Sequence, residues 1–130
     1  MRLLLDTQSF LWFLAGDTRL SKNARQKIAD LDNEVYVSIG SLWEIAIKSS
    51  LGKLNLSKPF ESFIPEQLEE NEIEILHIRL DDLSQLFRLP FHHRDPFDRL
   101  IIAQAIIRGM PVVTSDDIFS EYEVKLLDKV

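Results

Sequence analysis

The sequence contains no cysteine, which excludes a disulfide framework, a thiolate metal site and a cysteine nucleophile. Glycine and proline are scarce, at 4 and 5 residues, and there is neither a low-complexity stretch nor an internal repeat. No segment approaches the roughly 20 apolar residues that span a bilayer. The apolar start at Leu3-Leu4-Leu5 is interrupted at Asp6, before it is long enough for a signal peptide. We therefore expect a cytoplasmic protein.

The composition is that of one ordinary globular domain. Hydrophobic residues make up 45% and charged residues 28% of 130 residues, so we expect a single domain over 1–130. The 15 basic residues are outnumbered by 21 acidic ones, for a net charge of −6. Overall charge therefore does not indicate a nucleic-acid binder, and such a function would need a local basic patch or metal ions.

Short apolar runs alternate with segments of helical periodicity. Strands are predicted at 3–5, 34–37, 73–76, 111–113 and 124–127. Helices are predicted at 9–15, 21–31, 41–51, 59–70, 81–87 and 95–108, with a helical turn at 116–121. The alternation predicts an α/β fold with a mostly parallel sheet. Ligands of such sheets bind beyond the carboxyl ends of the strands.

Two acidic residues follow predicted strands directly. Asp6 comes after Leu5, and Asp116 comes shortly after Val113. Either carboxylate could instead cap the following helix or favour its dipole, and for Asp6 we weigh cap and site equally. Of the adjacent pair Asp116 and Asp117, the first is closer to the strand and is the one we assign to the site.

Glu44 lies in an apolar helix, between Leu42-Trp43 and Ile45-Ala46-Ile47. Its spacing to Ser41 fits a capping box, and its spacing to Lys48 fits a helix ion pair. Both structural interpretations are common, and for Glu44 alone they are slightly favoured. However, the helix offers no wide polar face for this carboxylate.

Asp98 is the more informative acid. Asp95-Pro96 predicts a helix start, with Asp95 as the cap and Pro96 at the first position. Asp98 then shares the apolar stripe with Ile101, Ile102 and Ala105. A carboxylate on a buried helix face is costly unless it is paired or binds metal, so we assign the chemistry to Asp98.

Asp6, Glu44, Asp98 and Asp116, if gathered, would repel one another, and divalent cations would relieve the repulsion. Oxygen ligands select Mg²⁺ or Mn²⁺, which favours hydrolysis of phosphodiesters by a metal-activated water. Basic side chains near the site would attract the polyanion: Arg94, Arg99, Lys48 and Lys53. His92 and His93 lie in a loop bounded by proline and show no zinc-ligand spacing.

Four sequence blocks resemble the PIN-domain ribonucleases, and in particular the VapC-like toxins of bacterial type II toxin–antitoxin pairs. They are Leu3-Leu4-Leu5-Asp6-Thr7, Val37-Ser38-Ile39-Gly40-Ser41-Leu42-Trp43-Glu44-Ile45-Ala46, His93-Arg94-Asp95-Pro96-Phe97-Asp98-Arg99-Leu100-Ile101-Ile102-Ala103-Gln104-Ala105 and Val113-Thr114-Ser115-Asp116. They occur in the family's order and span nearly the whole chain. The length matches the stand-alone toxin form.

The resemblance implies a three-layer α/β/α sandwich around a mostly parallel sheet. It also implies an endoribonuclease that depends on Mg²⁺, with Mn²⁺ able to substitute, and that leaves 3′-hydroxyl and 5′-phosphate ends. By position, the family's acidic quartet falls on Asp6, Glu44, Asp98 and Asp116, with Asp6 and Asp98 as direct metal ligands and the other two completing the site. Thr114 matches a hydroxyl two residues before the last acid. We expect Arg94, Arg99, Thr114 and Lys48 to bind substrate.

The resemblance further implies a homodimer and a small antitoxin partner that lays an apolar helix on the toxin. Candidate groove residues are Phe10, Trp12, Phe13 and Trp43, although core positions are the more common role of such side chains. The sequence departs from many relatives at Gln8, where they carry histidine. Gln8 has no assigned metal role.

Other acidic Mg²⁺ sites fit less well. A haloacid-dehalogenase site needs a second aspartate where Gln8 stands, and a receiver domain needs paired acids and a lysine at positions where none occur. A second alternative is a catalytically silent PIN fold that binds RNA or protein. The presence of all four acids disfavours it.

Overall fold

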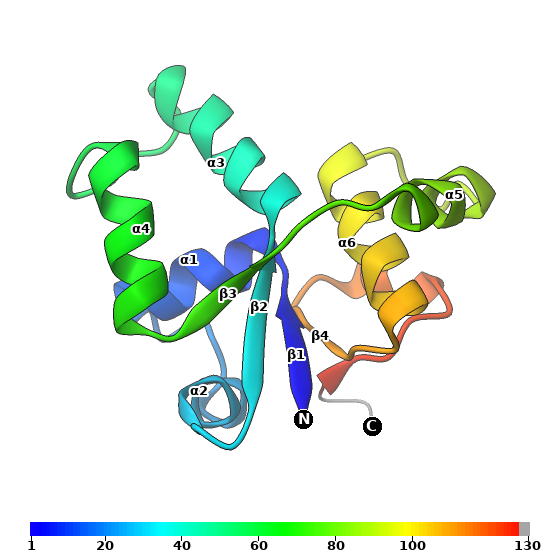
Figure 1. Ribbon diagram of the computed structural model, residues 1–130, viewed down its shortest axis with the longest axis horizontal. Coiled ribbons are helices and arrows are strands. Elements are labelled where there is room, and N and C mark those ends of the chain that lie inside the picture. The colour runs from blue at the N-terminus through cyan, green and yellow to red at the C-terminus, as the bar shows by residue number, and fades with distance from the viewer. Residues whose placement is uncertain (128–130) are drawn as a thin grey trace.

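The computed structural model describes residues 1–127 as a parallel four-stranded sheet between two layers of helices (Figure 1). The strands lie in the order β3-β2-β1-β4, and β1 pairs in parallel with both β2 and β4. In chain order the elements are β1 (Arg2–Leu5), α1 (Thr7–Ala15), α2 (Lys22–Ala29), β2 (Glu34–Ser38), α3 (Ile39–Ser50), α4 (Phe60–Glu70), β3 (Ile73–Leu76), α5 (Leu80–Arg88), α6 (Pro96–Arg108), β4 (Val112–Val113) and the 3₁₀ helix η1 (Asp117–Glu121). The predicted α/β fold with a parallel sheet is confirmed.

Alternation along β1 separates two apolar cores. Leu3 and Leu5 pack with the helices α1 to α4, whereas Leu4 packs on the opposite face with α6 and the C-terminal segment. All three leucines are fully buried, and each such burial contributes about 2 kcal/mol to folding. The apolar run is therefore a central strand covered on both faces, and the three-layer arrangement is confirmed.

Several predicted helix boundaries differ from the structure by one or two residues. The helix predicted from Ser41 begins at Ile39, because the Ser38 hydroxyl accepts a hydrogen bond from the Gly40 backbone and caps it. The strand predicted at 124–127 is wrong. Only an isolated bridge joins Leu126 to Val112 there, and the remainder of the segment does not extend the sheet. The end of the predicted domain, residues 128–130, lies outside the described residues.

Helix α3 approaches α6 closely. A Cβ atom at Gly40 would lie 2.5 Å from Cδ2 of the buried Leu100. Beyond this contact, the Trp43 and Phe97 rings meet edge to face at 5.3 Å. The two helices that carry Glu44 and Asp98 are thereby held side by side.

Helix α5 is joined to α6 by a buried polar cluster. Asp82 accepts hydrogen bonds from Arg108 at 2.8 Å, from the Arg79 backbone at 2.9 Å and from Gln104 at 3.3 Å. Burial alone would raise the pKa of Asp82, but these hydrogen bonds outweigh it and lower the pKa. None of the helices within residues 1–127 is long and apolar enough to cross a bilayer.

Candidate active site

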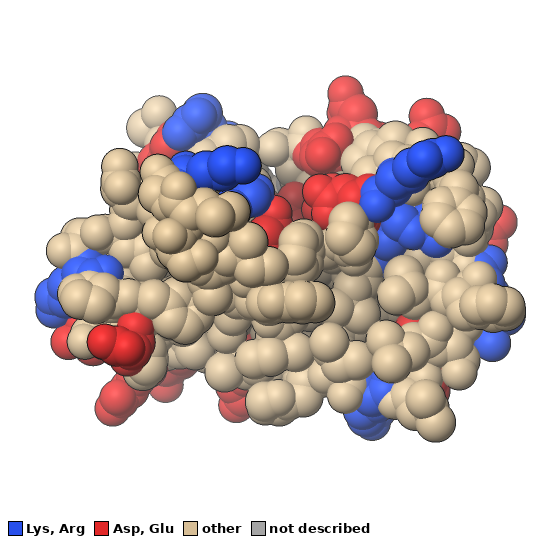
Figure 2. Space-filling view, turned by 90° about the horizontal axis from the view of Figure 1, so that it is seen from above, with Lys and Arg blue, Asp and Glu red and all other residues tan. Residues whose placement is uncertain are grey.

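A cleft of about 840 Å³ lies at the carboxyl end of the sheet, where Asp6 follows β1 and Asp116 follows β4. All four assigned acids line it: Asp6, Glu44, Asp98 and Asp116. Viewed from above, acidic side chains gather in a hollow between two lobes, with basic side chains on both flanks (Figure 2). The fold thus brings together carboxylates from four separate elements.

Asp6 is both a helix cap and a cleft residue. One carboxylate oxygen accepts from the Ser9 backbone at 2.8 Å and caps α1, and the other accepts from the Thr114 hydroxyl at 2.6 Å. The same hydroxyl accepts from the Asp116 backbone at 3.0 Å. Burial raises the pKa of Asp6, although the hydrogen bonds from Thr114 and Ser9 oppose the shift. Thr114 therefore links the ends of β1 and β4.

Glu44 is buried, and its carboxylate forms an ion pair with Lys48 at 2.7 Å. The hydrogen bond to Glu44 raises the pKa of Lys48. The capping-box interpretation is wrong, because Ser41 lies inside α3 and its hydroxyl accepts from Thr7 at 2.9 Å. The helix ion pair is confirmed, and it neutralises Glu44 at the cleft wall.

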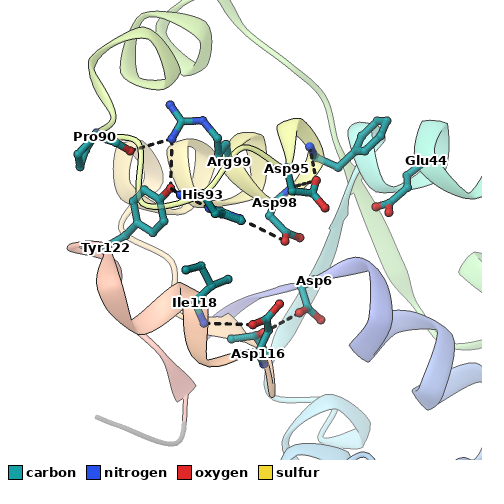
Figure 3. A network of polar contacts seen from close by, with 12 residues as sticks. Asp6, Glu44, Pro90, His93, Asp95, Asp98, Arg99, Asp116, Ile118 and Tyr122 are labelled. Atoms are coloured by element: carbon teal, nitrogen blue, oxygen red, sulfur yellow. Dashed lines mark hydrogen bonds and ion pairs between the residues drawn. The ribbon is translucent and has the colours of Figure 1, made fainter.

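Asp98 carries the clearest electrostatic signature of the site. Its pKa is raised to about 7, first by burial and then by the negative charges of Asp95, Asp6, Asp116 and Glu44. Asp95 caps α6 as predicted, accepting from the backbone of Phe97 and Asp98. Figure 3 shows Asp98 pointing into the space between Glu44, Asp6 and Asp116, with Asp95 beside it. The repulsion expected from the sequence is therefore concentrated on Asp98.

Asp116 and Asp117 differ in their position relative to the cleft. Asp116 lines the cleft and accepts from the Ile118 backbone at 3.1 Å, which caps η1. Both side chains are exposed, but Asp117 is absent from the cleft lining. The geometry favours the assignment of the earlier acid.

The donor chemistry of the cleft fits a hard divalent cation. Its acidic side chains offer carboxylate oxygens, which Mg²⁺ and Mn²⁺ prefer, and burial together with the neighbouring negative charges raises the pKa of Asp98. Within residues 1–127, no three acidic or histidine side chains are already close enough together to enclose an ion. An ion would therefore have to draw the side chains of Asp6, Asp98, Asp116 and Glu44 inward.

The residues predicted to bind substrate do not all lie in the cleft. Lys48 lines it, as does Lys53, whereas Arg94 is not part of the lining. Thr114 contacts Asp6, so the structure gives it a positioning contact. Arg99 is 5% exposed and donates to the Pro90 carbonyl at 2.7 Å and to the Tyr122 hydroxyl at 3.1 Å. The structure does not support a substrate contact by Arg99.

The four candidate groove aromatics occupy different places. Phe10 is fully buried in the core, and Phe13 packs against it. Trp12 lines the cleft, whereas Trp43 is 61% exposed and stacks on Phe97 outside the lining. Of the four, only Trp12 lies where a ligand in the cleft would touch it.

Sequence reasoning did not connect His93 with the acidic site. Its ring contacts Asp98 at 3.4 Å and the Tyr122 hydroxyl at 2.8 Å (Figure 3). A histidine five positions before an assigned acid is a weak signal, and the partnership with Tyr122 spans 29 positions of sequence. Only the packed C-terminal segment reveals it.

The chain matches known proteins over most of its length. A family model described as "PIN domain" matches residues 3–125. The chain is 34% identical to Ribonuclease VapC22 of Mycobacterium tuberculosis over 114 residues, which is 87% of this chain and 85% of that protein.

Two solved structures share the fold. One is VapBC2 from Rickettsia felis bound to a DNA fragment from their promoter, with a TM-score of 0.72, 17% identity and coverage of 97% of this chain and 96% of that one. The other is VapBC-1 from nontypeable Haemophilus influenzae, with a TM-score of 0.65, 14% identity and coverage of 93% and 91%.

Proposed function

This chain belongs to the PIN domain family, and from that premise we propose that it is a metal-dependent endoribonuclease, the toxin of a type II toxin–antitoxin pair. It hydrolyses RNA phosphodiesters in the cytoplasm with Mg²⁺, for which Mn²⁺ can substitute. The observation that carries the proposal is the cleft lined by Asp6, Glu44, Asp98 and Asp116. A relative named as a ribonuclease, similar over most of both chains, supports it.

In this proposal Asp6 and Asp98 hold the metal directly, and Glu44 and Asp116 complete the site. When bound, Mg²⁺ would supply an activated water and neutralise charge on the phosphate. Thr114 keeps Asp6 oriented through its hydrogen bond. Attack by water, and not by the ribose hydroxyl, leaves a 3′-hydroxyl and a 5′-phosphate.

The substrate backbone would meet basic side chains at the cleft wall. Lys48 and Lys53 both line the cleft, so they can contact phosphates flanking the scissile bond. Arg94 is exposed on the loop before α6 and stays a proposed contact. Arg99 is better suited to holding that loop, because its guanidinium is occupied by loop carbonyls.

We also propose a homodimer and an antitoxin partner. Two apolar stripes are exposed, on α3 and on α5: Trp43, Ile47 and Leu51, and Leu80, Leu83 and Phe87. Exposed stripes at helical spacing favour burial against another chain. An antitoxin helix would enter the cleft beside Trp12, because that end of the cleft is lined by apolar side chains of α1.

The test is cleavage of total cellular RNA by the purified protein with Mg²⁺ or Mn²⁺, alongside EDTA and the variants Asp6→Asn and Asp98→Asn. We expect discrete fragments that disappear in EDTA and in both variants, while circular dichroism shows that the variants stay folded. Cleavage by a variant at near wild-type rate would remove that residue from the site. Intact RNA together with tight RNA binding would instead favour a silent binding module.

A further inference from the structure

His93 lies in the loop between α5 and α6, and its ring connects the acidic cleft to the C-terminal segment. The side chain is 18% exposed and packs edge to face on Tyr122, with ring centroids 5.5 Å apart. Its two ring nitrogens have different partners. Nδ1 lies 2.8 Å from the Tyr122 hydroxyl, and Nε2 lies 3.4 Å from Oδ2 of Asp98.

The hydrogen bonds of Tyr122 determine which nitrogen of the ring donates. The phenol oxygen accepts from Arg99 Nη1 at 3.1 Å and from the His93 backbone at 3.3 Å. Two accepted bonds fill its lone pairs, so its own hydrogen goes to the remaining partner, Nδ1. Nδ1 therefore accepts, and the uncharged ring carries its proton on Nε2, facing Asp98.

The hydrogen bonds that run from Asp98 through His93 and Tyr122 end at Arg99, which also lies on α6. Arg99 follows Asp98 directly, is buried, and donates to the carbonyls of Pro90 and Leu89. Its guanidinium also lies 4.0 Å from the centre of the Phe91 ring. Helix α6 thus holds the loop that carries His93, and His93 returns to Asp98 on the same helix (Figure 3).

The Asp98 carboxylate depends on His93 for its hydrogen bonding. Within residues 1–127, the contact from His93 is the one hydrogen bond that its carboxylate accepts. The neighbouring acids are held by other groups, since Thr114 and Ser9 bond Asp6 and Ile118 bonds Asp116. Without His93, the Asp98 carboxylate would turn freely about its side-chain bonds.

We propose that His93 is a positioning residue for Asp98. Its Nε2–H holds Oδ2 so that Oδ1 is presented to the cation, and Tyr122 and Arg99 keep the ring in the required tautomer and orientation. This inference rests on the proposed metal site. Loss of a group that orients a metal ligand typically weakens metal affinity by about tenfold or more.

The test is titration of Mn²⁺ into the purified chain without RNA, with free Mn²⁺ followed by electron paramagnetic resonance. His93→Ala and His93→Phe remove the donor, and the phenylalanine keeps the packing on Tyr122. His93→Gln retains an N–H donor. His92→Ala is the matched control, because His92 also packs on Tyr122, at 4.7 Å, but makes no contact with Asp98.

We expect His93→Ala and His93→Phe to weaken Mn²⁺ binding by about tenfold, His93→Gln to retain most of the affinity, and His92→Ala to match the wild type. Wild-type affinity in His93→Phe, or an equal loss in His92→Ala, overturns the role of His93 while leaving the metal site in place. If the wild type itself binds no Mn²⁺, the proposed function fails, and this inference fails with it.

Discussion

The cleft carboxylates accept from several kinds of donor. Asp6 accepts from a hydroxyl and a helix amide, Glu44 from Lys48, and Asp98 from a histidine ring. Among the residues that the structure describes, 1–127, Glu44 is the one cleft acid paired with a lysine or arginine, so its neighbours keep their charge uncompensated. At the scale of single residues, hydrogen bonds thus orient the carboxylate oxygens of the site. Their mutual repulsion lowers the stability of the protein without metal.

We expect Asp98→Asn to stabilise the metal-free protein above pH 7. Native Asp98 has a pKa of about 7, whereas the ordinary carboxyl value is 3.8, so the native state holds a proton that the unfolded chain releases. The wild type thus loses stability as the pH rises from about 4 to 7. The asparagine variant escapes this loss, on the order of 1 kcal/mol after screening by solvent.

The measurement is thermal unfolding of both proteins in EDTA at pH 4 and pH 8. The melting temperatures should agree at the lower pH, and the variant should melt a few degrees higher at the upper one. Equal melting temperatures at pH 8 would mean that Asp98 bears no repulsion in the native state.

A second prediction separates the adjacent acids after β4. Asp116→Asn should lower RNA cleavage by about 100-fold or more, because Asp116 lines the cleft. Asp117→Asn removes the same charge one position away, from an exposed side chain outside the lining, and should cleave like the wild type. Initial cleavage rates of a labelled RNA decide between them, and the reverse order would move the site by one residue.

At the scale of elements, the site depends on how closely α3 and α6 approach. Gly40 has no side chain, and Leu100 fills the space that a Cβ would occupy. The approach brings Glu44 and Asp98 to the same cleft. Spacing between helices, and not any single contact, sets the separation of these two carboxylates.

We therefore expect Gly40→Ala to destabilise the protein by about 1–3 kcal/mol, since the added methyl overpacks against the buried Leu100. Cleavage should also fall, because α3 must move away from α6. The measurement is urea unfolding together with RNA cleavage. In a Leu100→Ala background the methyl has room, so the same substitution should cost much less. Additive losses in the double variant would show that Leu100 is not the obstacle.

At the scale of the whole molecule, the net charge of −6 opposes binding of RNA only when the charges are averaged over the surface. Acids occupy the hollow, and basic side chains flank it (Figure 2). A bound divalent cation would offset much of the negative charge of the cleft acids. Metal binding and binding of a polyanion are therefore expected to be coupled.

The corresponding prediction is that Mg²⁺ or Mn²⁺ raises the melting temperature of the wild type. A ligand bound only by the native state stabilises it by mass action, by about 2.7 kcal/mol at 100 times its dissociation constant. Thermal scans across millimolar metal measure this, and Asp98→Asn should show a smaller rise. The acids are not already gathered around an ion. A melting temperature of the wild type that does not change with metal would argue against the metal site.

The element order, and the candidate acids that the fold brings to one cleft, could be predicted from local chemistry. Leu3-Leu4-Leu5 is apolar on both sides, which indicates a central strand, and Asp95-Pro96 marks a helix start that the structure confirms. Asp6 and Asp116 are candidates because each follows a parallel strand at the edge of the sheet where ligands bind. Each of these signals depends on residues only a few positions apart, so it can be recognised without knowledge of the fold.

The remaining features depend on contacts between distant segments. Ser41 fitted a cap, yet it accepts from Thr7, 34 positions away, and Arg99 looked like a phosphate contact until the loop carbonyls around it were seen. The partnership of His93 with Tyr122 and the raised pKa of Asp98 likewise arise only when separate elements meet. The sequence by itself determined which residue types follow each strand. The tertiary structure decided which of them share a cleft and which become buried, because burial and charge repulsion act through space and not along the chain.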